Sequence, residues 1–334
     1  MKNKLKVMVV GAGDMGRNHI RCYQGIEDVI LSAVVDSNEN RAKKASEDFK
    51  IPNAYTDYNT AFEKEKPDII SVCLPAFLHS EVSVKALKQG INVLCEKPIA
   101  LNVQMAQDMV NAAKSSKAKL AIIFQERYCD FFEEFKKRMS LLGKGLIYRA
   151  TDMREIRPKI LMHSKSGNGG PIIDCCVHDI DRLLQLFGRP KMVFAIGDVY
   201  AKGKKELKNI HDLAIDTASI NMEFENGNKA EIFFCWGLPK GFSGFSNMEI
   251  LGPEGVIKNY RDRIEHYFKD GKIETVSGLF TDGHKRQIKE FVSAIQNGEQ
   301  PQVEPQQSLK VLKVAEAILK SIETCKIVDL NIYA

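Results

Sequence analysis

The sequence has no long hydrophobic run, no block of basic residues and no paired cysteine motif. Nothing in its 334 residues approaches the roughly 18 consecutive apolar residues of a membrane span. The net charge of +5 is small and dispersed, which argues against a nucleic-acid surface or a membrane-binding lysine run. The eight cysteines mostly lie in apolar stretches without CxxC spacing, as reduced core residues do. These absences predict a cytoplasmic protein that binds no nucleic acid, no membrane and no metal.

The N-terminus resembles a secretory signal only superficially. Lysines precede the apolar stretch Val7–Val10, but that stretch is short and ends at Gly11, so it indicates a buried strand. A hydrophobic content of 44% and a charged content of 27% are ordinary for a globular protein. Because 334 residues exceed what one compact core usually holds, we expect two domains.

The first part of the chain alternates apolar strand-length runs with helical stretches. This alternation is typical of a doubly wound parallel sheet, and therefore of an α/β fold. The expected strands are Leu5–Val10, Val29–Val35, Asp68–Leu74, Ile91–Cys95 and Lys119–Phe124.

A glycine-rich turn follows the first expected strand directly and leads into a helix. Gly11, Gly13 and Gly16 form a GxGxxG motif, with Asp14 and Met15 between the last two glycines. In this context the glycines permit a tight turn, a close approach of backbone to a pyrophosphate, and close packing of helix on strand. The N–H groups at the start of the helix would hold the pyrophosphate. The motif predicts a dinucleotide-binding Rossmann domain with these five residues at the cofactor.

Asp36 stands at the end of the second expected strand, 20 residues after Gly16. A carboxylate there would accept hydrogen bonds from the adenine ribose hydroxyls and repel a 2′-phosphate. The nearest arginine, Arg41, falls within the next expected helix. The sequence therefore favours NAD over NADP.

Further polar residues follow two strand ends, where ligands of such sheets bind. Leu74 ends one strand and Pro75 and His79 follow it, whereas Glu96 and Lys97 follow another strand, so all five are predicted at the cofactor. His79 could equally be a helix-start residue. Lys97 could stabilise a developing alkoxide, or it could be a surface lysine paired with Glu96.

After Phe124 the pattern changes to strands in series, several joined by hairpin-type turns, and then to two helices. Such strands predict an open, largely antiparallel sheet, and we place the domain boundary between residues 1–124 and 125–334. The expected strands are Gly145–Glu155, Lys191–Ala201, Asp216–Glu225, Lys229–Trp236, Asn247–Leu251, Val256–Tyr260, Arg263–Phe268 and Lys272–Val276. The expected helices are Lys285–Gln296 and Gln306–Glu323.

The stretch Gly169–Asp181 carries acid and imidazole side chains on an expected amphipathic helix. Asp174, His178 and Asp181 stand at i, i+4 and i+7, on one face of a continuous helix. A carboxylate one turn from an imidazole can fix its tautomer and favour its protonated form. Taken alone, the polar flank of a helix is more often merely solvated, so the motif needs support from the rest of the chain.

Taken together, the motifs resemble the glucose–fructose oxidoreductase, inositol dehydrogenase and rhizopine-catabolism (Gfo/Idh/MocA) family. The resemblance runs nearly end to end and depends on the glycine turn, Glu96-Lys97-Pro98, the segment Phe124–Tyr128, and Gly169-Gly170 with its acid and histidine. It implies an NAD(P)-dependent dehydrogenase that acts on a secondary alcohol of a sugar, cyclitol or nucleotide sugar. By resemblance, Lys97, Asp174 and His178 form the catalytic group. The second domain would bind substrate and form a homodimer or homotetramer through its sheet.

The substrate contacts implied by the resemblance are Lys97, Asp174 and His178, together with Gln125, Arg127 and Arg157. Gln125 replaces a common Asn, and Tyr128 a common Phe. For Arg127 and Arg157, structural salt bridges are equally plausible, and Asp181 is more plausibly structural. Two other functions stay open: a non-catalytic NAD- or sugar-sensing regulator, and a lyase or hydrolase that uses hydride transfer transiently.

Overall fold

The computed structural model describes residues 4–260 and 262–331, which form two compact units. The first unit contains residues up to Gln125 and the segment Asp282–Leu309, and the second contains Glu126–Thr281 and the chain from Lys310 onward. The predicted outer limits at residues 1 and 334 lie outside the described residues. The predicted boundary at 124/125 falls within one residue of the first change of unit. The chain returns to the first unit at Asp282, and the pattern of strands and helices did not predict this return.

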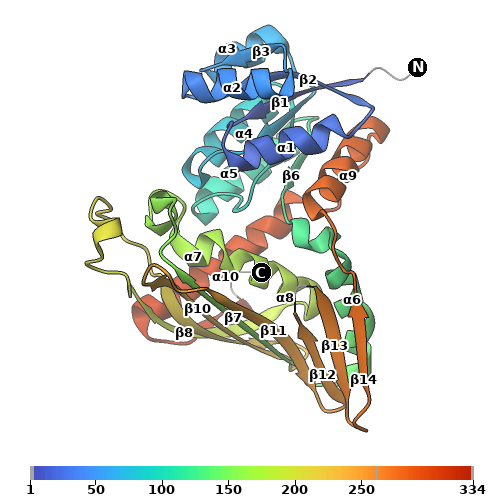
Figure 1. The fold of residues 1–334 in the computed structure, drawn as a ribbon, viewed down its shortest axis with the longest axis vertical. Helices are drawn as coiled ribbons and strands as arrows, with labels where there is room; N and C mark the ends of the chain where they lie inside the picture. Colours follow the sequence, from blue (N-terminus) through green and yellow to red (C-terminus); the bar gives the residue numbers. More distant parts are fainter. Residues whose placement is uncertain (1–3, 261, 332–334) are drawn as a thin grey trace. The chain divides into compact units, whose positions relative to one another are not determined.

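The first unit is built on a six-stranded parallel sheet in the order β3-β2-β1-β4-β5-β6 (Figure 1). The central strands are buried on both sides, which explains their nearly continuous apolar runs. The strands are β1 Leu5–Val10, β2 Val29–Val35, β3 Asn53–Tyr55, β4 Ile69–Val72, β5 Asn92–Cys95 and β6 Leu120–Ile122. The expected doubly wound parallel sheet is confirmed, with the short edge strand β3 as an addition.

Six α-helices lie entirely within the described part of the first unit. They are α1 Asp14–Gln24, α2 Glu39–Phe49, α3 Tyr58–Glu65, α4 His79–Lys88, α5 Val103–Ser115 and α9 Gly283–Asn297. The last of these explains why the chain returns, because Ile288, Phe291 and Val292 of α9 are buried in the same core cluster as Val7 and Val9 of β1. Burial of an apolar helix face against the sheet is what stabilises that position.

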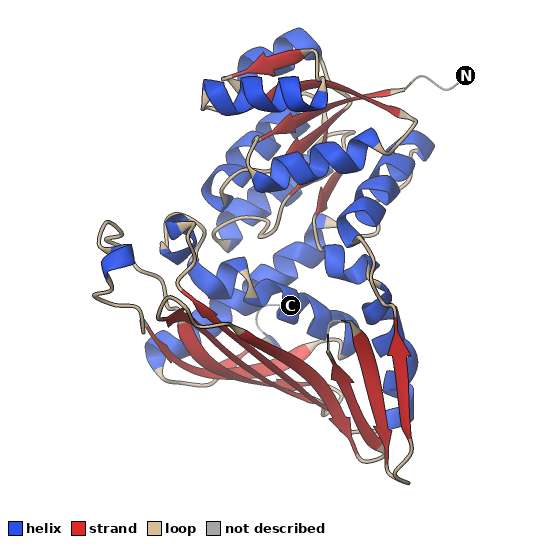
Figure 2. Cartoon of the chain, viewed as in Figure 1, coloured by secondary structure: helices blue, strands red, loops and turns tan. Residues whose placement is uncertain are grey.

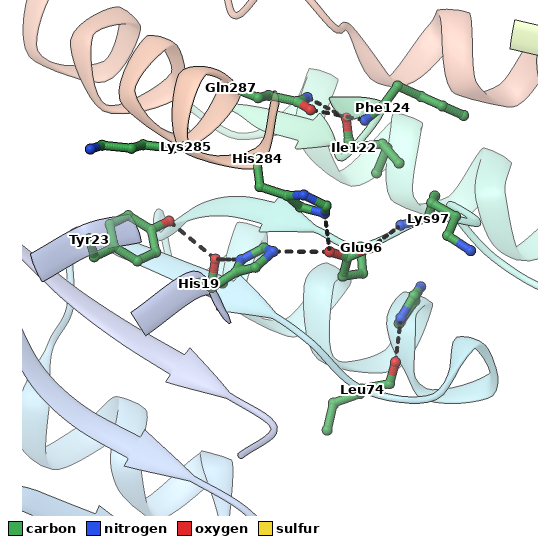
Figure 3. Close-up of polar contacts among 12 residues, drawn as sticks. His19, Tyr23, Leu74, Glu96, Lys97, Ile122, Phe124, His284, Lys285 and Gln287 are labelled. Atoms are coloured by element: carbon green, nitrogen blue, oxygen red, sulfur yellow. Dashed lines mark hydrogen bonds and ion pairs between the residues drawn. The ribbon is translucent and has the colours of Figure 1, made fainter. Parts of the chain in front are cut away.

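Gln287 of α9 adds a polar link to the edge of the first sheet. Its side-chain oxygen accepts a hydrogen bond from the Phe124 N–H at 3.0 Å, and its Nε2 donates to the Ile122 carbonyl at 2.8 Å. Figure 3 shows both bonds. An edge strand otherwise presents unpaired backbone groups, so this amide completes the edge of the sheet.

The second unit is built on a nine-stranded mixed sheet in the order β14-β13-β12-β11-β7-β10-β9-β8-β15. All neighbouring strands are antiparallel except β7 and β10, which are parallel. The strands are β7 Ile147–Glu155, β8 Pro190–Asp198, β9 Thr217–Phe224, β10 Lys229–Leu238, β11 Phe245–Gly252, β12 Gly255–Asn259, β13 Arg263–Phe268, β14 Ile273–Ser277 and β15 Val328–Asp329. The predicted largely antiparallel sheet, and with it the α/β fold, is confirmed.

The helices of the second unit lie on one side of this sheet. Figure 2 shows the helices in blue and the strands in red. The helices of this unit are α6 Asp130–Met139, α7 Gly170–Asp174, α8 Cys176–Leu186 and α10 Pro305–Thr324, of which the last begins in the first unit. Strand β8 alternates between buried and exposed residues: Val193 and Ala195 are buried, whereas Phe194 and Ile196 are exposed. One face of the sheet therefore carries the core, and the other exposes apolar side chains. In the described part of the chain, no helix is long and apolar enough to cross a membrane.

Candidate functional site

Only glycine fits at two positions of the segment that joins β1 to the first turn of α1. Gly11 has φ +103°, and a Cβ there would lie 2.3 Å from the Cys73 carbonyl oxygen. A Cβ at Gly16 would lie 1.7 Å from the Gly11 carbonyl oxygen. At Gly13, by contrast, nothing lies within 4 Å of the position of a Cβ. The backbone at Gly13 is thus open to a ligand at the N-terminus of α1, which suits a pyrophosphate.

Asp14 and Met15 are the first two residues of α1, with Gly13 as the N-cap. The cap makes no side-chain hydrogen bond. The N-terminus of a helix carries a partial positive charge and attracts anions. The turn therefore fits the cofactor whose binding its sequence predicts.

Asp36 ties the glycine turn to the start of α2. Its Oδ2 accepts a hydrogen bond from the Ala12 N–H at 2.9 Å, and its Oδ1 accepts one from the Asn38 N–H at 2.9 Å. Arg41 lies in α2 as expected, but its guanidinium reaches back to Asp36 Oδ1, with Nε at 3.1 Å and Nη2 at 2.8 Å. A half-exposed cation therefore lies directly beside the carboxylate that is predicted to bind the ribose.

His79 is buried and joins two loops that follow strands of the first sheet. Its Nδ1 lies 2.7 Å from the Pro98 carbonyl oxygen, and its Nε2 lies 2.8 Å from that of Leu74. Burial lowers the pKa of His79 despite these carbonyls, and a neutral ring donates to only one of them. The imidazole holds the segments after β4 and β5 together. Cofactor contacts by Leu74, Pro75 and His79 remain predictions.

A chain of buried side chains leads from α1 to the end of β5 (Figure 3). Tyr23 OH lies 3.1 Å from Ser71 Oγ, which lies 2.8 Å from His19 Nδ1. His19 Nε2 lies 2.9 Å from Glu96 Oε1. In either protonation state of the ring, a hydrogen on Nε2 donates to Glu96, and the Ser71 hydroxyl bridges His19 Nδ1 and the Tyr23 hydroxyl. Such a fully satisfied network fixes the position of each of its members.

Glu96 is the acceptor on which this network ends. Burial alone would raise its pKa, but the hydrogen bond from His19 and the charges of His19, His284 and Lys97 lower that pKa to about 2. His284 of α9 contributes its Nε2 at 3.8 Å from Glu96 Oε1. The second carboxylate oxygen accepts a hydrogen bond from the Lys97 N–H at 3.2 Å. Glu96 is therefore ionised, and its carboxylate holds the backbone N–H of Lys97, the predicted catalytic lysine.

Sequence reasoning missed His19 and His284 entirely. A signal for His19 was present, because it shares the buried stripe of α1 with Gly16, Ile20 and Tyr23. A histidine in such a stripe needs polar partners, and in the structure these come from Ser71 of β4 and from Glu96 after β5. His284 gave no such signal, since it stands at the start of a helix far along the chain.

In the second unit, the expected continuous helix is interrupted between two of its candidate residues. Asp174 ends α7, and α8 begins at Cys176, so the prediction of one regular helical face is wrong. The physical reason lies at Cys175, whose N–H bonds to the Pro171 carbonyl and whose carbonyl accepts the His178 N–H at 3.0 Å. This hydrogen bond joins residues three apart, as in a 3-10 helix, and it interrupts the α-helical series of bonds between residues four apart.

The two glycines at the start of α7, the N-cap Gly169 and the first residue Gly170, are required by the backbone conformation and the space available there. Gly169 and Gly170 have φ +78° and +77°, and a Cβ at Gly170 would lie 2.3 Å from the Ala214 Cβ. This close approach seats the N-terminus of α7 against the segment before β9. It brings Asp174 to a buried position, where its Oδ1 accepts a hydrogen bond from Asn168 Nδ2 at 3.3 Å.

Arg127 and Asp181 form a buried ion pair. Arg127 Nε donates to Asp181 Oδ2 at 2.8 Å, and Nη2 donates to Oδ1. The two residues, on η2 (Gln125–Tyr128) and α8, are thus joined by a bidentate fork. This geometry favours the structural alternative for Arg127 and agrees with a structural Asp181. Gln125 begins the same short helix.

Arg157 lies in the loop after β7, where its backbone N–H donates to His163 Nε2 at 3.0 Å. Its guanidinium carbon lies 5.5 Å from the ring centroid of Trp236. Among the residues that the structure describes, no group of three or more His, Cys, Asp or Glu side chains could hold a metal ion.

Comparisons with known proteins identify the family of the chain. The family profile of an oxidoreductase family with an NAD-binding Rossmann fold matches residues 5–124, and that of its C-terminal α/β domain matches residues 163–330. Myo-inositol 2-dehydrogenase of Thermotoga maritima is 26% identical, over 98% of this chain and 99% of the relative. The NADP⁺-dependent scyllo-inositol 2-dehydrogenase of Bacillus subtilis is 23% identical, over 82% of both chains.

A solved structure shares the whole fold. Levoglucosan dehydrogenase in complex with NADH has a TM-score of 0.87 and 22% identity, over 98% of this chain and 99% of that one. Both family profiles match this chain in order and together span most of it. The chain therefore belongs to the Gfo/Idh/MocA oxidoreductase family.

Proposed function

We propose that this protein is an NAD-dependent dehydrogenase that oxidises a secondary alcohol of a sugar, a cyclitol or a nucleotide sugar. The observation that carries the proposal is the glycine turn, whose open side at Gly13 lies at the N-terminus of α1 and beside a fixed Asp36. Family membership adds the reaction class, because the relatives are named as inositol and sugar dehydrogenases. When bound, the nicotinamide would supply the hydride acceptor.

The catalytic roles follow from residue chemistry. We assign His178 as the general base that takes the hydroxyl proton, since an imidazole titrates near neutral pH. Asp174, held by Asn168, would orient that imidazole. The Lys97 ammonium would donate a hydrogen bond to the reacting oxygen and stabilise its developing negative charge. Glu96 fixes the backbone of Lys97 and acts as a positioning residue.

The preference for NAD is supported by the Asp36 side chain beside the turn. Asp36 Oδ2 accepts one hydrogen bond, from Ala12, so a lone pair is left for a ribose hydroxyl. Arg41 works in the opposite direction, since its guanidinium could turn from Asp36 toward a 2′-phosphate. We therefore expect NAD to be preferred by a moderate factor, with measurable use of NADP.

We also propose that the open face of the second sheet forms a homodimer or homotetramer interface. The register places Phe194 and Ile196 of β8 on the same face as Ile147 of β7 and Phe245 of β11. All four side chains are at least 38% exposed. A set of large apolar side chains on one sheet face is typical of a protein–protein contact.

The experiment that tests the function mixes the purified protein with NAD and a panel of polyols, sugars and sugar nucleotides. Appearance of reduced nicotinamide with any compound would exclude a purely sensing protein. A compound that is converted without net reduction of NAD would instead indicate a lyase or hydrolase with transient hydride transfer. If NAD neither binds nor is reduced, the proposed function is wrong.

A further inference from the structure

Trp236, near the end of β10, is the centre of a cluster of charged and polar side chains in the second unit. The indole is buried, and its Nε1 donates to Asp152 Oδ2 at 3.1 Å. The guanidinium carbons of Arg154 and Arg157 lie 5.7 Å and 5.5 Å from its ring centroid. The His163 ring contacts it edge-on, with the centroids 6.3 Å apart. Two cations and an imidazole thus surround one aromatic ring.

The two arginines differ in how their charge is neutralised. Arg154 Nε donates to both oxygens of Asp152, at 2.7 Å and 2.9 Å, and so forms an ion pair. Arg157 has no carboxylate within ion-pair distance among the described residues, and its Nε is buried without a hydrogen-bond partner. A buried guanidinium N–H that lacks an acceptor calls for an explanation.

His163 provides a second donor without an acceptor. Its Nε2 accepts the Arg157 backbone N–H, so a neutral ring must carry its hydrogen on Nδ1. Burial lowers the pKa of His163, and this favours the neutral ring. The charge of Arg157 also lowers that pKa, whereas the charge of Asp216 raises it. The Nδ1 atom is buried and has no hydrogen-bond partner in the described chain. Leaving two such donors unmet costs about 1–3 kcal/mol each.

This cluster adjoins the predicted catalytic residues of the same unit. Asp152 Oδ2 accepts a hydrogen bond from Cys175 Sγ at 3.8 Å, and Cys175 directly follows Asp174. The charge of Asp174 also acts on Arg154. The unmet donors therefore belong to the surroundings of the site and not to a distant part of the fold.

We propose that Arg157, with His163, binds an anionic group of the substrate, so that this dehydrogenase acts on an acidic sugar or polyol. The group is an oxyanion, a carboxylate or a phosphate. An anionic oxygen accepts from both unmet N–H groups and neutralises the Arg157 guanidinium. The inference rests on the proposed dehydrogenase function and adds the charge of its substrate.

The test compares matched substrates in the full-length protein with NAD. Glucose, glucuronate and glucose 6-phosphate form one set, and galactose and galacturonate form another. We expect kcat/KM to be at least about tenfold higher for an anionic member, as a hydrogen bond to a charged group provides. The carboxylate and phosphate arms identify which oxyanion is bound. Equal values for neutral and anionic members would overturn the inference while leaving the dehydrogenase function intact.

Variants of Arg157 test whether the preference for anionic substrates depends on this side chain. Arg157→Gln should lower kcat/KM about 10- to 100-fold for the anionic member only, and Arg157→Lys should restore part of it. Arg189→Gln is a matched control, since Arg189 is half-exposed and paired with Glu225. A uniform loss for all members would contradict a charge-specific role.

Binding provides a readout that does not need turnover. Glucuronate and glucose 6-phosphate should raise the thermal midpoint of the wild-type protein more than glucose does, and Arg157→Gln should remove that difference. If no sugar is oxidised yet the difference is present, the proposed dehydrogenase function fails and the anion site stands. If neither anion stabilises the wild type beyond glucose, the inference is wrong.

Discussion

Replacing His19 with Leu removes the donor on which the buried network of Glu96 depends. The variant loses the 2.9 Å contact to Glu96 Oε1 and keeps the longer one from His284. Loss of a hydrogen bond to a buried charged group costs about 1.5–3 kcal/mol in the free energy of unfolding. For a unit of this size, roughly 2–4 °C per kcal/mol gives a thermal midpoint that is lower by roughly 3–12 °C.

The pKa of Glu96 gives an independent magnitude. Burial alone would raise that pKa, but His19, His284 and Lys97 bring it from its ordinary value of 4.5 to about 2 in the folded protein. That difference corresponds to ~3 kcal/mol for burial and the three partners together, and the His19 hydrogen bond is one part of it. Because the folded pKa is depressed, the stabilisation is complete above pH about 4.5 and is lost as the pH falls toward about 2. The stability advantage of the wild type over His19→Leu should therefore shrink across this window.

The assay is denaturant unfolding of both proteins near neutral pH and at pH about 3, with the midpoint and slope compared. Tyr23→Phe is the control, since it removes only the hydroxyl at the far end of the network and leaves the donor to Glu96 in place. It should cost about 1 kcal/mol at either pH. His19→Leu should also reduce kcat about tenfold through the displaced Lys97 backbone. A stability difference between wild type and His19→Leu that stays constant with pH would refute this reasoning.

Three further outcomes are expected. Asp36→Ala should weaken NAD binding and raise the ratio of NADP to NAD use, and Arg41→Ala should lower that ratio; equal use of both cofactors by the unchanged protein would contradict the preference. His178→Ala should lower turnover about 10²–10⁴-fold while calorimetry still detects NAD binding, and unchanged turnover would remove it as the base. Ile196→Glu should dissociate the oligomer in light scattering, whereas Ile30→Glu, at an equally exposed site of the first unit, should not; a monomeric wild type would refute the proposed interface.

The first unit was largely predictable because its signals are local. The turn Gly11–Gly16, the acid at Asp36 and the apolar strands are each defined by a few adjacent residues, and the structure places them at the expected strand ends. The edge strand β3 was missed because three half-exposed residues carry little periodicity.

The remaining differences depend on contacts between distant segments. The apolar stripe of α9 predicts that it packs against something, but not that its partner is the sheet formed by the start of the chain. The break at Cys175 was invisible because the apolar spacing continues across it, and a single backbone hydrogen bond decides the outcome. The link from His19 to Glu96 joins α1 to the end of β5, and no local pattern encodes such a pair.

The late return of α9 has a consequence for biosynthesis. During translation, the N-terminal 125 residues emerge with an incomplete apolar face, because Ile288, Phe291 and Val292 have not yet been made. The unit that carries the glycine turn therefore finishes folding only after the intervening unit has been synthesised, against the usual N-to-C order of domain folding. A nascent chain stalled before α9 would present this face, and the edge that Gln287 completes, to chaperones.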